Sequence, residues 1–154
     1  MKWCMARRPS IVGFMTEQNS LPQRLAGFVS STPGVDSVLL FTRDSMVHAY
    51  SRGISQEAAE QWSALLGNML SMSDQWARVT DRGACEHILL TDQAGRINVL
   101  ALTPGCGAGL FLAPDAEVKK CAFDAHLFFE ELKPVLPQEV PTTVGAAHQL
   151  QGVS

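Results

Sequence analysis

Residues 55–80 read SQEAAEQWSALLGNMLSMSDQWARVT, a stretch without proline that opens with a serine shortly after Gly53. A serine cap followed by an unbroken run of helix-compatible residues predicts one long helix. Apolar residues form two stripes down this helix, and the second lies about 100° further round than the first. The first stripe is Ala58, Trp62, Leu65, Met69, Met72 and Trp76, and the second is Ala59, Leu66, Leu70 and Ala77. Together the stripes are wider than a helix on one sheet needs, so we expect something else to cover the second stripe.

The segment before the long helix predicts a short helix and a hairpin. Ser20 can cap the short helix, and the Thr-Pro-Gly sequence at 32–34 ends it. Two strand-like runs follow at 35–42 and 46–51. The polar Arg-Asp-Ser sequence between them, at 43–45, suits a tight turn. We therefore expect these two strands to pair antiparallel.

The segment after the long helix predicts three strands and a last helix. The strand candidates lie at 85–91, 96–103 and 108–113, and short loops rich in glycine join them. Such short connections predict an antiparallel meander without crossover helices. The last helix is expected to start at Pro114 and to stop at Pro134. Its buried face is expected to be Val118, Ala122, Ala125, Phe129 and Leu132.

The predicted order is helix, two strands, long helix, three strands, helix. This order describes an α+β domain with a five-stranded antiparallel sheet and helices on both faces. Residues 20–136 are expected to form this one domain. Residues 1–19 are expected to be a flexible leader, with Met15 as an alternative start to Met1, and residues 137–154 a disordered tail.

The composition excludes several classes of partner. The chain has 154 residues, 46% of them hydrophobic and 18% charged, and its net charge is −3. It therefore has no excess of cations to bind nucleic acid or an anionic membrane. Its apolar runs are too short for a membrane-spanning helix or a signal peptide. Four scattered cysteines without a zinc-binding spacing favour a reducing, cytoplasmic location.

Two groups of residues resemble binding sites, and each has a plainer explanation. Cys85 and His87 stand two apart on a strand, as a pair of metal ligands might, but no further ligands are close in sequence. Packing or an interface explains them better. Gly105, Gly107 and Gly109 resemble a phosphate-binding loop, yet they stand between two strands and not before a helix. A tight turn is the favoured interpretation.

No pattern in the chain predicts catalysis. Asp44, Ser45 and His48 supply the residue types of a catalytic triad, but no nucleophile elbow or oxyanion-hole motif accompanies them. The tryptophans and methionines of the first stripe could line a ligand pocket, but their helical spacing favours a core or an interface. We therefore predict no catalytic residue, no cofactor and no metal.

The chain resembles the roadblock/dynein light chain family over residues 20–136. The features that carry this resemblance are the PGVDSVLLF strand at 33–41, the long helix from Ser55, the three strands after it, and the LAPDA sequence at 112–116. The family often has Asp-Gly in its first hairpin, where this chain has Asp-Ser at 44–45. The pattern is most similar to the bacterial versions, especially those of actinobacteria, which resemble regulators and scaffolds of Ras-like GTPases.

The resemblance implies a homodimer. In the family the long helices of two subunits pack together and the third strands pair at their edges. Such a dimer would cover the second stripe of the long helix and remove an exposed sheet edge. Leu66 and Leu70, if bare in a monomer, would each forgo about 1.5–3 kcal/mol of burial. The interface residues implied in this way are Ala59, Leu66, Leu70, Ala77, Cys85, His87 and Leu89.

The function implied is that of a non-enzymatic regulatory or scaffold subunit. By this resemblance it binds a small Ras-like GTPase and modulates its nucleotide cycle or its place in a signalling complex, such as one containing a sensor kinase. The resemblance favours positioning of GTPase loops over a catalytic arginine, for which Arg78 and Arg82 are the candidates. The alternatives are a pure protein–protein adaptor and a small-molecule sensor domain.

Overall fold

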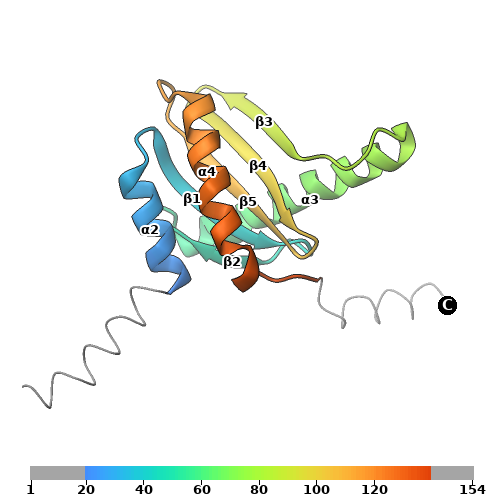
Figure 1. The fold of residues 1–154 in the computed structure, drawn as a ribbon, viewed down its shortest axis with the longest axis horizontal. Helices are drawn as coiled ribbons and strands as arrows, with labels where there is room; N and C mark the ends of the chain where they lie inside the picture. Colours follow the sequence, from blue (N-terminus) through green and yellow to red (C-terminus); the bar gives the residue numbers. More distant parts are fainter. Residues whose placement is uncertain (1–19, 140–154) are drawn as a thin grey trace, which may run out of the picture.

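The computed structural model describes residues 20–139 and confirms the predicted order of elements (Figure 1). The leader predicted at 1–19 and most of the tail predicted at 137–154 lie outside the described residues. Pro137 is described, and its carbonyl accepts a hydrogen bond from the Thr103 hydroxyl. The elements are α2 (Leu21–Ser31), β1 (Val35–Thr42), β2 (Val47–Tyr50), α3 (Gln56–Thr80), β3 (His87–Asp92), β4 (Gly95–Thr103), β5 (Cys106–Leu112), α4 (Val118–Leu132) and the 3-10 helix η1 (Lys133–Val135).

The five strands form one antiparallel sheet in the order β2-β1-β5-β4-β3. The first strand and the last strand of the chain thus lie side by side in the middle, and β2 and β3 form the two edges. Helices α2 and α4 cover one face of the sheet, and α3 crosses the other (Figure 1). The molecule therefore has three layers, as the α+β prediction with helices on both faces required.

The ends of the helices follow from local chemistry. The Ser55 side chain accepts a hydrogen bond of 3.1 Å from the backbone N–H of Ala58, which confirms the predicted cap of α3. Asp81, in the left-handed conformation, ends the same helix. Ser20 stands at the N-cap position of α2, but its side chain makes no capping hydrogen bond. The predicted start of the last helix at Pro114 is wrong, because α4 begins only at Val118.

The turn between β1 and β2 contains a serine in an uncommon conformation. Ser45 has φ 73°, a left-handed value that favours glycine, and it occupies the place where the resembling family often has glycine. The turn is held by the Thr42 hydroxyl, which donates to the Asp44 carboxylate, and by the Met46 N–H, which donates back to the Thr42 hydroxyl at 3.1 Å. The predicted hairpin is confirmed.

The sheet separates two apolar cores because successive residues of β1 point to opposite faces. Val38 and Leu40 contribute to the core under α2 and α4, and Leu39 and Phe41 to the core under α3. The buried residues of α4 are Cys121, Ala125, Phe129 and Leu132. The predicted face of this helix was slightly rotated, since Val118 and Ala122 are only half-buried.

The second stripe of α3 faces the sheet, so the expectation that something other than the sheet covers this stripe is wrong for three of its four residues. Ala59, Leu66 and Leu70 are at most 5% exposed. The reason is the absence of side chains at Gly107 and Gly109 of β5, where an added Cβ would lie 2.6 Å from a methyl carbon of Leu70 and of Leu66, respectively. These glycines lie inside a strand and form no loop, so the tight-turn interpretation holds only for Gly105.

Candidate interaction surface

The first stripe of α3 forms an uncovered apolar surface. Within the stripe Leu65 is 62% exposed, Met72 68% and Trp76 63%, and Val79, which follows on the same side of the helix, is 83% exposed. These residues are separated by seven, four and three positions, so they lie along one side of the helix. Trp62 and Met69 are half-buried on the same side. A monomer thus leaves a row of large apolar side chains in water, which is a common sign of a protein–protein contact.

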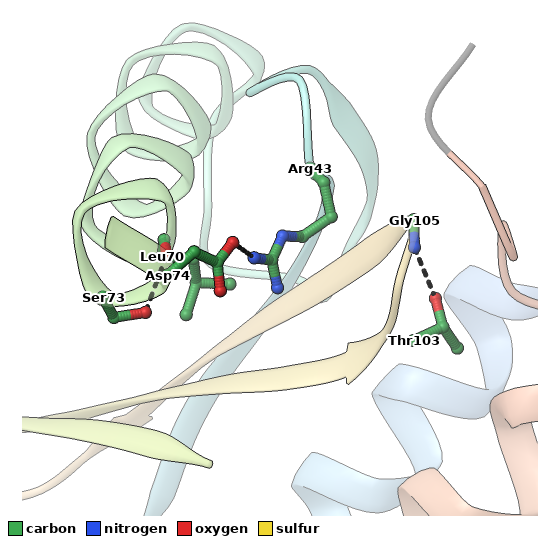
Figure 2. A network of polar contacts seen from close by, with 6 residues as sticks. All are labelled: Arg43, Leu70, Ser73, Asp74, Thr103 and Gly105. Atoms are coloured by element: carbon green, nitrogen blue, oxygen red, sulfur yellow. Dashed lines mark hydrogen bonds and ion pairs between the residues drawn. The ribbon is translucent and has the colours of Figure 1, made fainter. Parts of the chain in front are cut away.

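The C-terminal part of α3 projects past the edge of the sheet. In Figure 1 the helix runs behind the sheet and continues beyond β3. One ion pair holds the helix near the point where it leaves the sheet: Arg43, from the β1–β2 turn, donates to the Asp74 carboxylate (Figure 2). The Arg43 side chain is only 11% exposed. The Arg43 N–H also donates to the Gly105 carbonyl at 3.0 Å, which ties the two turns at this end of the molecule together.

The edge strand β3 is exposed on both faces. It pairs with β4 alone among the described strands, so its outer N–H and C=O groups face solvent. Leu89 and Leu90 are 47% and 36% exposed and point to opposite faces. Just before the strand, the half-buried Cys85 thiol donates to the His87 carbonyl at 3.4 Å. The edge therefore offers both backbone hydrogen-bonding groups and apolar side chains to a partner.

A cavity of about 500 Å³ lies between α3 and β3 and joins these two exposed features. The Trp62 ring packs against Phe111 of β5 with ring centroids 5.0 Å apart and forms part of its wall. Its polar lining residues are Asp36, Ser37, Asp92 and Arg96, and of these the two aspartates are exposed. The larger part of the lining is apolar and includes Trp62, Leu65, Met69, Leu90, Ile97 and Phe111.

A second hollow, of about 690 Å³, lies on the opposite face between α4 and β3. Asn98 lines it from β4 and is 5% exposed, and its Oδ1 atom has no hydrogen-bond partner among the described residues. His126 and Lys119 of α4 line the same hollow. Cys85, His87 and Glu130 also line it, and the Cys85 thiol donates to the backbone carbonyl of His87 and not to an imidazole.

The residue types considered for catalysis or metal binding make other contacts. The Asp44 carboxylate accepts from Thr42, and Ser45 packs beside Gly67 of α3. Burial lowers the pKa of His48, on the edge strand β2. Within residues 20–139, no three His, Cys, Asp or Glu side chains gather as metal ligands would. Over the same residues no helix has the length and apolar character needed to cross a membrane.

The seven predicted interface residues fall into two groups. Ala59, Leu66 and Leu70 are buried in the core and leave at most 5% of their surface free for a partner. The other four remain accessible: Ala77 and Cys85 are half-buried, and His87 and Leu89 are exposed. The sequence interpretation missed the exposed residues of the first stripe. The signal that could have identified them is the pair of glycines two apart on β5, which marks where the helix packs closest.

Comparisons with known proteins agree with this architecture. The family model described as Roadblock/LC7 domain matches residues 23–106, more than half of the chain. No curated protein sequence matches the chain. A solved Roadblock/LC7 domain from Streptomyces avermitilis has a TM-score of 0.69 at 17% identity, covering 76% of this chain and 98% of that one. MglB from Myxococcus xanthus has a TM-score of 0.68 at 5% identity, with 74% and 92% covered. MglB in a tetrameric arrangement has a TM-score of 0.64 at 13% identity, with 73% and 85% covered.

Proposed function

We propose that this chain, which belongs to the Roadblock/LC7 family, is a non-enzymatic regulatory subunit that forms a homodimer and binds a small Ras-like GTPase. The observation that supports the proposal is that three uncovered features belong to the same described part of the chain: the first stripe of α3, the apolar cavity beside it and the edge of β3. A catalytic or metal-binding role does not require exposed apolar side chains of this kind, whereas contact with a protein partner does.

A second copy of the chain fits this surface because an edge strand and an adjoining helix can both contact their own equivalents across a two-fold axis. Pairing of two β3 strands would satisfy the exposed backbone groups of both edges. Burial of each large apolar side chain in the dimer would contribute about 1.5–3 kcal/mol to the free energy of association. The MglB structure in a tetrameric arrangement supports self-association in a protein of the same fold.

The GTPase partner is proposed from family membership and from the likeness to MglB. We propose that the subunit acts by holding GTPase loops in place. Arg78 and Arg82, at the projecting end of α3, are exposed and are the residues that could instead reach a nucleotide as an arginine finger.

The test is a nucleotide assay with Ras-like GTPases from the same genome, each purified and loaded with fluorescent GTP or GDP. The intact chain is expected to bind one of them and to change its rate of hydrolysis or of nucleotide release. Arg78→Ala and Arg82→Ala are expected to retain the effect, whereas an arginine finger would lose 10³-fold or more. Binding without any change in either rate would favour the pure adaptor. Absence of binding to every GTPase would overturn the proposal.

A small-molecule sensor is the second candidate, and the apolar cavity beside α3 is the observation that favours it. A sensor would show a rise in melting temperature with a compound from a library of apolar metabolites. For a regulatory subunit whose cavity is filled by a protein side chain, no such rise is expected.

A further inference from the structure

The projecting end of α3 and the cavity beside β3 lie on the same face of the sheet. The helix end carries Met72, Trp76 and Val79, each more than 60% exposed. The cavity lies next to the other half of the helix, where Trp62 and Leu65 form its wall. One end of α3 thus offers large apolar side chains without a pocket, and the other end borders a pocket that nothing in the described chain fills.

The spacing along α3 relates these two ends by symmetry. Trp62 and Trp76 stand seven residues before and after Met69, which corresponds to about 10 Å along the helix in each direction. A two-fold axis passing near Met69 would make two α3 helices antiparallel. It would place Trp76 of one copy beside Trp62 of the other. The three-and-four alternation of the stripe is the spacing that such packing uses.

We propose that Trp76 of one copy docks into the α3–β3 cavity of a second copy, and that each cavity is complete only when the second copy contributes this residue. The inference rests on the proposed homodimer and names the contact that would hold it. A cavity of about 500 Å³ with an apolar lining has room for an indole ring. Asp36 and Asp92, two exposed residues of the lining, offer carboxylate acceptors for the indole N–H, which needs a partner when the ring is buried.

Position also fits. Leu90 lines the cavity and belongs to the edge strand, so the strand at which a second copy would pair forms part of the cavity wall. The projecting part of α3 extends past this same edge (Figure 1). A second copy that pairs at β3 would therefore receive the helix end over its own sheet, on the face that holds its cavity.

The first experiment is a disulfide cross-link between two differently tagged chains in a background with Cys4→Ser and Cys85→Ser. One chain carries Trp76→Cys and the other Leu90→Cys, so the mixed dimer retains Trp76 on the second chain. Oxidation is expected to give a mixed disulfide. The matched pair, Phe123→Cys with Leu90→Cys, is expected to give none, because Phe123 is equally exposed, at 63%, but lies on α4 over the opposite face.

The second experiment measures the dimer dissociation constant by sedimentation equilibrium. Trp76→Ala removes two docked rings from each dimer, so the constant is expected to rise on the order of a hundredfold or more. Phe123→Ala is expected to leave it unchanged. A wild-type dimer that Trp76→Ala does not weaken and that gives no mixed disulfide would overturn this inference and leave the homodimer standing. A wild-type monomer would overturn both, and the nucleotide assay would still decide GTPase regulation.

Discussion

Leu70 of α3 packs directly against the backbone of Gly107 in β5, where a Cβ atom on the glycine would lie 2.6 Å from the Leu70 Cδ1. The same Cβ would lie 2.7 Å from the Phe41 ring. The helix can approach the sheet this closely only because the strand has no side chain at that position. This contact decides which stripe of α3 becomes core and which stays free for a partner.

Gly107→Ala is therefore expected to destabilise the domain. The added methyl group has no space in a core where Leu70 and Phe41 are fully buried, so the free energy of unfolding should fall by about 1–3 kcal/mol. Urea unfolding followed by circular dichroism measures this. Gly27→Ala is the control, since nothing lies within 4 Å of its Cβ and it should stabilise α2 by about 0.5–1 kcal/mol. Equal effects of the two substitutions would contradict the packing account.

Leu70→Ala is expected to weaken the fold itself and not only an interface. A fully buried leucine reduced to alanine costs about 2–5 kcal/mol, because a cavity remains. Leu65→Ala, at 62% exposure, should cost far less in a monomer at low concentration. Thermal unfolding at a concentration where the chain is monomeric separates the two. A Leu70→Ala variant with unchanged stability would restore the interface role that the sequence implied for this residue.

The order of the elements could be predicted from the sequence, because each helix and strand is bounded by local signals such as the Ser55 cap. The orientation of α3 could not be predicted in the same way. Either of the two apolar stripes of α3 could pack on the sheet. Which one does so depends on Gly107 and Gly109, which lie about 40 residues further along the chain. The cavity beside Trp62 also requires the packing of distant strands and has no signature in the sequence.

Asp74→Ala is expected to loosen the projecting end of α3. It leaves the largely buried Arg43 guanidinium without its partner, at a cost of about 1–3 kcal/mol. Gln75→Ala, at an exposed neighbouring position, serves as the control and should change stability by less than about 0.5 kcal/mol. Hydrogen exchange should show faster opening of the last turns of α3 in Asp74→Ala only. Unchanged exchange there would show that the ion pair does not hold the helix.

Alkaline pH is expected to destabilise the domain through Cys106. Burial raises the pKa of the Cys106 thiol from 9.0 to about 12 in the folded chain. Between these values the unfolded chain has released the proton and the folded chain has kept it, so rising pH favours unfolding, by at most about 1.4 kcal/mol per pH unit. Between pH 8 and pH 10, urea unfolding should show a larger decrease in the free energy of unfolding for the wild type than for Cys106→Ala. The same loss in both proteins would exclude this thiol as the cause.

The molar mass in solution shows whether the free stripe of α3 is the contact between two copies. Light scattering on the intact chain is expected to give twice the monomer mass of 16.7 kDa. Leu65→Glu with Met72→Glu should give a folded monomer, and Phe123→Glu with Leu127→Glu, at comparable exposure on α4, should remain a dimer. A wild-type monomer, or a dimer that the α3 substitutions do not dissociate, would mean that this stripe is not the contact between two copies.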